Sequence, residues 1–442
     1  MDGELVPLTC AFRRRGFASF AQRPRSTITL QREESDMALR EIRSAAVIGA
    51  GTMGSGIAMT FANAGIDVRI MDADAAALER ARKTVATTYG SAVERGRLSQ
   101  ADADARLARI TQVGSYAELA GVDAVVEAVF EDLGVKRDVF AALGKAVDAN
   151  TLLATNTSTL DVDAIAHAAP GPDRTIGLHF FSPAHVMKLL EVVRGHDTAP
   201  ETVEAAVELG KRLGKVPVVV GNCDGFVGNR MLLGYKREAE FLVLAGATPK
   251  EVDDALEAFG FAMGPFAVSD LAGVDVGWRA KQERIKRGAP PPFSVTDIPD
   301  ELVAAGRFGQ KSGKGYYRYE KGDRTRYADP EVDALVAKER ARLNVAQREV
   351  SNDEIVARCV YALVIEGARI LDDGIANSAS DIDTIWVNGY GFPRPRGGPM
   401  QYAQDVGLKR VLEEVRAFEK SDPEFWRVPS GLVRAAETGS FS

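Results

Sequence analysis

The chain has 442 residues, which is too long for one compact core and indicates about two or three domains. Hydrophobic residues make up 45% and charged residues 26%, as in ordinary soluble proteins, and the net charge of −7 gives no support for a nucleic-acid partner. No run of eighteen apolar residues occurs, so we expect no membrane span. The cysteines at 10, 223 and 359 are far apart, which favours a reducing compartment and argues against a disulfide framework or a CxxC metal site.

The first forty residues differ in composition from the rest. Between residues 5 and 31 there is no acid, while five arginines lie among Ser, Ala and Phe. This pattern resembles an organellar transit peptide over residues 1–36. Asp2 and Glu4 favour the other interpretation, because transit peptides avoid acids: residues 1–40 are then a disordered tail, or an upstream extension with the true start at Met37. On that interpretation we expect a cytoplasmic protein of bacterial type.

Residues 44–74, SAAVIGAGTMGSGIAMTFANAGIDVRIMDAD, have the pattern of a nucleotide-binding unit. An apolar run at 45–48 predicts a strand, GxGxxG follows it, and apolar residues at helical spacing come next. In such a unit the glycines allow a tight turn, close approach of a pyrophosphate and packing of helix on strand. Asp72 follows the second strand, where a carboxylate accepts a hydrogen bond from a ribose 2′-hydroxyl and disfavours a 2′-phosphate. NAD is therefore favoured over NADP, although FAD uses the same fingerprint.

The alternation of strand and helix continues along the chain. Residues 76–109 predict charged helices, 121–132 a strand ending in acids and then a helix, and 151–160 a strand that runs into a polar loop. This alternation predicts a doubly wound parallel sheet to about residue 222. Ligands bind beyond the carboxyl ends of such strands. The polar side chains expected at those ends are Asp72, Glu127, Glu131, Asn156 and Ser158.

GLHFFSPAHVMKLLEVV, residues 177–193, predicts strand, loop and strand. If the two strands lie side by side, His179 and Glu191 can approach each other. A carboxylate beside an imidazole fixes its tautomer and stabilises the imidazolium. The pair therefore suits a base that removes a hydroxyl proton, although a packed core histidine with a structural hydrogen bond is the alternative.

The remaining histidines are weaker candidates. A metal site built from His179, His185 and Glu191 is disfavoured, because the spacing gives no compact ligand pair like HExxH. We expect no metal. His185 lies in the loop, where we expect it to be solvated or near substrate, and His167 and His196 are expected on the surface.

Five ordered motifs, GAGTMG, VVEAVFEDLGVK, TNTSTL, HFFSPAHVMKLLEVV and DGFVGNR, resemble those of the L-3-hydroxyacyl-CoA dehydrogenases of fatty-acid β-oxidation. The likeness is to the dehydrogenase half of peroxisomal-type multifunctional enzymes and their bacterial relatives, and it covers residues 42–435. It implies an NAD-dependent enzyme that oxidises an acyl-CoA thioester, (S)-3-hydroxyacyl-CoA. The acyl chain length stays open.

The resemblance also implies site residues. His179 corresponds to the catalytic base and Glu191 to its carboxylate partner, while Ser158 contacts the substrate's 3-oxygen and Asn229 lies near the reacting group. The implied cofactor-binding residues are Gly49, Gly51, Thr52, Met53, Gly54, Asp72, Glu131 and Lys136. Many members have asparagine where this chain has Ser182, a shorter residue whose contact we expect to be weaker or water-mediated.

Two stretches in the second half resemble each other, residues 246–277 and 374–407. Each follows a helix and runs from Gly through an acid pair and an aliphatic helix to Gly-Phe, Gly-Pro and Asp before Gly. We infer a duplicated all-α domain, with an NAD-binding Rossmann domain at 41–222, a first helical copy at 223–330 and a second at 345–442. Residues 285–345 join the copies, and their Gly-, Lys- and Tyr-rich part predicts an extended loop.

The duplication bears on assembly. By resemblance, single-copy members dimerise through this module, so a second copy in one chain could take a partner's place, and we expect a monomer or a homodimer. Alternatively, both copies only complete a helical core. A separate enoyl-CoA hydratase or thiolase is an expected partner. Two other functions stay open: a dehydrogenase of the same architecture for a hydroxy acid without CoA, and a non-catalytic NAD-binding subunit of a β-oxidation complex.

Overall fold

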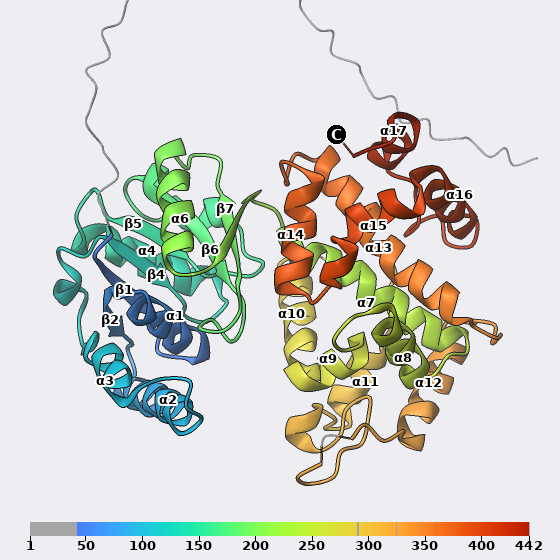
Figure 1. The fold of residues 1–442 in the computed structure, drawn as a ribbon, viewed down its shortest axis with the longest axis horizontal. Helices are drawn as coiled ribbons and strands as arrows, with labels where there is room; N and C mark the ends of the chain where they lie inside the picture. The colour runs from blue at the N-terminus through green and yellow to red at the C-terminus, as the bar shows by residue number, and fades with distance from the viewer. Residues whose placement is uncertain (1–41, 290, 324, 442) are drawn as a thin grey trace, which may run out of the picture. The chain divides into compact units, whose positions relative to one another are not determined.

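The computed structural model describes residues 42–289, 291–323 and 325–441, so the expectations for residues 1–40 lie outside the described residues. An eight-stranded sheet comes first along the chain and helices follow it (Figure 1). The strands are β1 (Ser44–Ile48), β2 (Asp67–Met71), β3 (Ile110–Val113), β4 (Ala124–Glu127), β5 (Leu152–Thr155), β6 (Thr175–Phe180), β7 (Leu189–Arg194) and β8 (Val216–Gly221).

The strand order is β3-β2-β1-β4-β5-β6-β7-β8. Strands β1 to β6 run parallel, which confirms the predicted doubly wound fold. The last two strands differ from the prediction, because β7 is antiparallel to β6 and β8 is parallel to β7. Only residues 181–188 join β6 to β7, and a parallel crossover needs about a dozen residues or more, so the chain must return in the opposite direction.

Helices cover both faces of the sheet, as the strand–helix alternation predicted. On β1, Ala45 and Val47 pack on the side of α1 and α6, while Ala46 and Ile48 pack on the side of α4 and α5. Successive side chains of a strand point to opposite faces, so a strand that is buried on both sides is apolar throughout. The helices of this region are α1 (Thr52–Asn63), α2 (Ala75–Glu94), α3 (Gln100–Ala108), η1 (Tyr116–Leu119), α4 (Leu133–Ala146), α5 (Val162–Ala166), η2 (Pro172–Arg174) and α6 (Pro200–Arg212).

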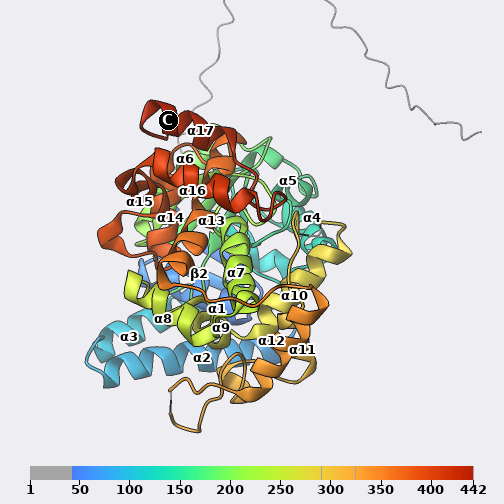
Figure 2. The same cartoon turned by 90° about the vertical axis from the view of Figure 1, so that its right-hand side faces the viewer.

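The rest of the described chain is helical. Its two long helices, α7 and α13, pack side by side in the largest apolar core (Figure 2). The helices are α7 (Gly228–Ala245), α8 (Pro249–Phe259), α9 (Pro265–Ala272), α10 (Val274–Lys286), α11 (Ile298–Ala304), η3 (Gln310–Ser312), α12 (Pro330–Arg342), α13 (Asn352–Asp372), α14 (Ala379–Gly389), η4 (Arg394–Arg396), α15 (Pro399–Val406), α16 (Leu408–Glu419) and α17 (Ser430–Thr438). In the part of the chain that the structure describes, no helix combines the length and apolarity that a membrane span requires.

The two similar stretches fold alike around an equivalent aspartate. In the first, Asp253 of α8 accepts hydrogen bonds from the backbone N–H groups of Phe266 and Ala267 at the start of α9. In the second, Asp383 of α14 accepts from the corresponding groups at the start of α15. In both copies a Gly-Pro pair begins the second helix, and a Cβ on its glycine would lie 2.3 Å from the aspartate. The glycine is therefore needed for close approach of the two helices.

The segment between the copies is more ordered than expected. It contains α11 and α12, and the Tyr-rich part predicted to be an extended loop packs into the core. The backbone N–H groups of Tyr316 and Tyr317 donate to Asp270, and the Tyr317 hydroxyl donates to Asp253 at 2.7 Å. The segment is a loop, as predicted, but its packing was not predicted: aromatic side chains that bury their rings and find a carboxylate acceptor hold it in place without regular secondary structure.

Candidate active site

The predicted catalytic pair lies on neighbouring strands. In the antiparallel register of β6 and β7, His179 stands directly opposite Glu191. The neighbours of His179 along β6, Leu178 and Phe180, pack on the α6 side of the sheet, whereas Leu189 and Val193, which flank Glu191 at spacing two, pack in the core of the helical region. Alternation along each strand therefore directs both functional side chains to the face that meets α7.

His179 and Glu191 form a buried hydrogen-bonded pair. His179 Nδ1 lies 2.7 Å from Glu191 Oε2, the histidine is 6% exposed and the glutamate is fully buried. The other carboxylate oxygen, Oε1, accepts from the backbone N–H of Gly228 at 3.0 Å, at the first residue of α7. Because Glu191 occupies Nδ1, Nε2 is the ring nitrogen that can take a proton from a ligand.

Two aromatic rings pack against the imidazole, at centroid distances of 4.3 Å for Phe181 and 5.7 Å for Phe226. Phe226 is one of the two described non-glycine residues with positive φ, at 50°. A bulky residue in the left-handed region is strained, and such strain is concentrated at functional sites. Phe226 was not among the predicted site residues, although it lies in the same DGFVGNR motif as Asn229.

Ser158 is held at the end of β5 by Glu131. Its backbone N–H donates to Glu131 Oε1 at 2.7 Å and its hydroxyl donates to the same oxygen at 3.1 Å, while the Thr157 hydroxyl donates at 2.7 Å. Burial alone would raise the pKa of Glu131, but the Lys136 ammonium and these hydrogen bonds together hold it below its ordinary value. Glu131 is therefore an anion that orients the serine.

Lys136 is buried beside Glu131. Its ammonium lies 2.7 Å from Glu127 Oε1 and 3.4 Å from Glu131 Oε2, and its side chain has no exposed surface. In this arrangement it positions Glu131, whose side chain is 34% exposed. Direct cofactor contacts at Lys136 and at Glu131 stay predictions.

Asn229 lies in the first turn of α7 and links the helices to the sheet. Its Nδ2 donates to the backbone carbonyl of Ser158 at 3.4 Å, and its Oδ1 accepts from the Tyr390 hydroxyl at 2.9 Å. The structure thus brings together the four residues proposed for catalysis: His179 with Glu191, and Ser158 with Asn229. Tyr390, from the second helical copy, was not among the predicted site residues.

The glycine-rich turn between β1 and α1 has the geometry that its sequence predicts. Gly49 has φ +104°, and a Cβ there would lie 2.6 Å from the carbonyl oxygen of Ala128. A Cβ on Gly54 would lie 1.8 Å from the carbonyl oxygen of Gly49, so the helix could not pack on the strand. Around Gly51 a Cβ would meet no atom within 4 Å, which leaves the backbone open to approach.

The residues of this turn fit NAD. The N-cap residue of α1 is Gly51, so no side chain caps the first turn of the helix. The N–H groups of that turn can therefore hold a pyrophosphate. The exposed Thr52 and the half-buried Met53 lie in the same turn. Asp72 at the end of β2 accepts from the backbone N–H groups of Ala50 at 2.7 Å and Asp74 at 2.9 Å. It therefore ties the glycine turn to the second strand, and its remaining lone pairs suit a ribose hydroxyl.

The other histidines are not part of this pair. His167 and His196 are exposed, as expected, and the side chains of both bind the surface carboxylate of Asp197. His185 differs from the expectation of solvation: its Nδ1 is buried without a hydrogen-bond partner, and burial followed by the nearby Lys215 charge lowers its pKa. Among residues 42–289, 291–323 and 325–441, no three His, Cys, Asp or Glu side chains are grouped to hold a metal ion.

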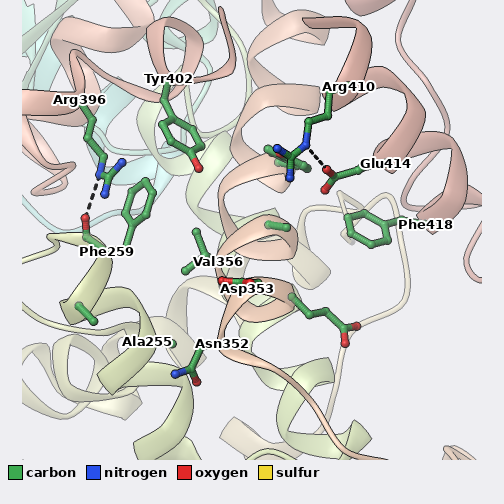
Figure 3. A pocket seen from close by; sticks show the side chains of 14 residues that line it. Ala255, Phe259, Asn352, Asp353, Val356, Arg396, Tyr402, Arg410, Glu414 and Phe418 are labelled. Atoms are coloured by element: carbon green, nitrogen blue, oxygen red, sulfur yellow. Dashed lines mark hydrogen bonds and ion pairs between the residues drawn. The ribbon is translucent and has the colours of Figure 1, made fainter. Parts of the chain in front are cut away.

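A cavity of about 640 Å³ lies elsewhere, among α8, α13, α15 and α16 (Figure 3). Three of its charged side chains are engaged: Arg410 pairs with Glu414, and Arg396 donates to the backbone carbonyl of Phe259 and lies over its ring. None of the predicted site residues lines it. The catalytic pair, and not the size of a cavity, therefore locates the candidate site.

Two protein-family models match the chain, one over the sheet region and one over the helices that follow it. The model described as 3-hydroxyacyl-CoA dehydrogenase, NAD binding domain, matches residues 44–223. The model described as 3-hydroxyacyl-CoA dehydrogenase, C-terminal domain, matches residues 225–319. These matches confirm the resemblance that the five motifs indicated and the expected NAD-binding domain.

Individual proteins are similar along most of the chain. The peroxisomal bifunctional enzyme of Danio rerio is 46% identical over 432 residues, which are 95% of this chain and 60% of that enzyme. The structure resembles 3-hydroxybutyryl-CoA dehydrogenase of Escherichia coli K12, with a TM-score of 0.79, 29% identity and coverage of 90% of this chain and 99% of that one. It also resembles (S)-3-hydroxybutyryl-CoA dehydrogenase of Ralstonia eutropha, with a TM-score of 0.59, 36% identity and coverage of 63% and 99%.

The relatives also bear on location and extent. Relatives from animals and plants are named as peroxisomal, and another is a bacterial fatty acid oxidation complex subunit. These names do not support the expectation of a cytoplasmic protein. The chain spans little more than half the length of these curated relatives.

Proposed function

Because the chain belongs to the 3-hydroxyacyl-CoA dehydrogenase family, we propose that it catalyses the NAD-dependent oxidation of (S)-3-hydroxyacyl-CoA to 3-oxoacyl-CoA in fatty-acid β-oxidation. The observation that carries the proposal is the buried His179–Glu191 pair, with Nε2 left for a proton. A protein that only bound the nucleotide would have no need for this pair beside the strand ends. The non-catalytic subunit is therefore the weaker alternative.

In the proposed reaction, His179 Nε2 removes the proton of the 3-hydroxyl group, and Glu191 stabilises the resulting imidazolium. When bound, NAD supplies the acceptor for the hydride that leaves carbon 3. In the reverse direction, the His179 imidazolium protonates the oxygen of the reduced carbon. The Gly228 N–H at the start of α7 holds the Glu191 carboxylate, so the orientation of the base depends on the contact between sheet and helices.

Ser158 and Asn229 would position the substrate oxygens. The Ser158 hydroxyl donates to Glu131 in this structure and would turn to donate to the 3-oxygen of a bound substrate, whose own proton goes to His179, while Thr157 and the Ser158 N–H remain donors to Glu131. The Asn229 amide supplies N–H donors for the thioester region. Ser182 is exposed in the β6–β7 loop. We retain the prediction that its contact with substrate is weaker than that of asparagine, or is mediated by water.

The test is NADH oxidation by the purified protein with acetoacetyl-CoA, and with free acetoacetate as the control. We expect turnover with the thioester alone. Turnover with both would favour a dehydrogenase of hydroxy acids without CoA. No turnover with either acetoacetyl-CoA or a long-chain 3-oxoacyl-CoA would favour the non-catalytic subunit and reject the proposal.

A second prediction concerns the cofactor. We expect Asp72→Ala to raise the Kd for NAD by about tenfold or more, equivalent to ~1.4 kcal/mol, because the ribose loses its acceptor and the glycine turn loses its tie. Asp74→Ala is the control, since Asp74 is exposed and caps α2 without touching the glycine turn. Calorimetry should give a near-normal Kd for the control, and an unchanged Kd for Asp72→Ala would reject the assignment.

Assembly is part of the proposal. We propose that the chain is a monomer or a homodimer, with the second helical copy packed where single-copy relatives would meet a partner. The packing of α13 on α7 supports this arrangement. A separate enoyl-CoA hydratase or thiolase would then supply the substrate or consume the product.

A further inference from the structure

A tyrosine of the second helical copy reaches the candidate active site. Tyr390 follows α14, and its hydroxyl donates to Asn229 Oδ1 at 2.9 Å. The ring packs edge-on against Phe181, whose own ring covers His179. Burial, followed by the nearby Glu191 charge, raises the pKa of Tyr390 well above its ordinary value, so the hydroxyl keeps its proton and can donate.

The surrounding packing fixes this tyrosine in position. Trp386, one turn earlier in α14, stacks on the ring with centroids 4.8 Å apart, and the Trp386 indole N–H donates to the sulfur of Met231 in α7. A Cβ on Gly228 would lie 2.3 Å from the Tyr390 ring, so only glycine permits this approach. The same Gly228 donates its N–H to Glu191. Tyr390 therefore contacts both Gly228, which holds the carboxylate partner of His179, and Asn229.

We infer that Tyr390 is a positioning residue for the reaction and that the second helical copy thereby completes the active site. The hydroxyl binds Oδ1 of Asn229, which leaves Nδ2 as the donor directed at Ser158 and at a substrate placed there. A flipped amide would set Oδ1 against the Ser158 carbonyl oxygen, so this carbonyl selects the orientation, and the Tyr390 hydroxyl then fixes the side chain by donating to the Oδ1 that it meets. This inference rests on the proposed function, because it assigns Asn229 its role in binding substrate.

Comparison of the two copies supports a specific role for this hydroxyl. The first copy has Phe259-Gly260-Phe261 where the second has Tyr390-Gly391-Phe392. Phe259 packs among aromatic rings in the core, where a ring without a polar group is sufficient. The second copy has a hydroxyl at the equivalent position, and it is there that the ring meets the polar side chain of Asn229.

Tyr390→Phe removes the hydroxyl and keeps the ring. We expect kcat/KM with acetoacetyl-CoA to fall by about five- to tenfold, the effect of one net hydrogen bond, with an unchanged Kd for NAD. Tyr402→Phe is the matched control, because Tyr402 lies in the same copy, packs on Phe259 and makes no hydrogen bond through its hydroxyl in the described structure. We expect the control to have wild-type kinetics.

A double-mutant cycle separates positioning from general stability. If Tyr390 acts through Asn229, Tyr390→Phe should cause no further loss in an Asn229→Ala background. Equal losses in both backgrounds, or wild-type kinetics for Tyr390→Phe, would overturn the inference while leaving the proposed function intact.

A measurement that does not depend on turnover tests the inference even if the proposed function is wrong. In protein labelled with 15N-asparagine, Asn229→Ala identifies the side-chain amide signals of Asn229. We expect Tyr390→Phe to shift or broaden these signals, and Tyr402→Phe to leave them unchanged. Unchanged Asn229 signals in Tyr390→Phe would overturn the inference even if the wild-type protein had no activity with acetoacetyl-CoA.

Discussion

Replacing His179 with glutamine should reduce kcat by about 10²- to 10⁴-fold, the contribution of a positioned general base. Glutamine approximates the size of the imidazole and its amide can still donate to Glu191, but it cannot take a proton from a hydroxyl group. The nucleotide turn lies on β1 and α1, so we expect NAD affinity to be unchanged. Steady-state kinetics with acetoacetyl-CoA and calorimetry with NAD measure the two quantities separately.

The control for this variant is His196→Gln, which removes a surface imidazole whose hydrogen-bond partner is Asp197. We expect wild-type kinetics from it. If His179→Gln kept wild-type kcat, the base would have to be another group, and the alternative interpretation of His179 as a packed core residue would be correct. If it lost NAD affinity or folded poorly, the defect would be structural, and the loss of activity would say nothing about the base.

The geometry of the catalytic pair could be predicted from local sequence. Two apolar runs joined by residues 181–188 favour adjacent strands, and the register that the structure shows sets residues 179 and 191 opposite each other on one face. The glycine turn could be predicted equally well, because two of its glycines meet a steric requirement that the structure confirms: a Cβ at Gly49 or Gly54 would collide with backbone. Short-range constraints of this kind leave few alternatives.

Contacts between distant segments could not be predicted in this way. Tyr390 lies 161 residues from Asn229 along the chain, and no periodicity relates them. The repeat did contain a signal, since tyrosine replaces the phenylalanine of the first copy, but only the packing of α14 against β7 shows what the hydroxyl meets. Similarly, the antiparallel direction of β7 follows from the length of its loop, which the pattern of apolar runs alone did not decide.

Lys136 is an example of a motif residue whose place in the structure changes its interpretation. The VVEAVFEDLGVK motif suggested contact with the cofactor, yet the first turn of α4 carries the ammonium into the interior, between Glu127 and Glu131. Glu127 ends β4 and accepts further hydrogen bonds from Val129 N–H and the Thr155 hydroxyl. Lys136 therefore stabilises the ends of β4 and β5 through Glu127, and we expect its removal to lower the stability of the fold.

We expect Lys136→Met to lower the free energy of unfolding by about 3–5 kcal/mol, because the Glu127 carboxylate would remain buried without its cation. Chemical denaturation measures this loss. Lys83→Met is the control: Lys83 lies 3.6 Å from Glu79 on the surface of α2 and is 70% exposed, and we expect the loss of such an exposed pair to leave the stability close to that of the wild type.

A second substitution should restore the stability that Lys136→Met loses. Adding Glu127→Gln to Lys136→Met removes the unpaired charge, while the amide can still accept from Val129 N–H and donate to the Thr155 hydroxyl. Because the penalty arises from a buried lone charge, the double variant should recover most of the lost stability. If the double variant stayed as unstable as Lys136→Met, packing of the lysine stem would be the cause. If Lys136→Met folded normally but bound NAD weakly, the role of Lys136 would lie in cofactor binding, either directly or through Glu131.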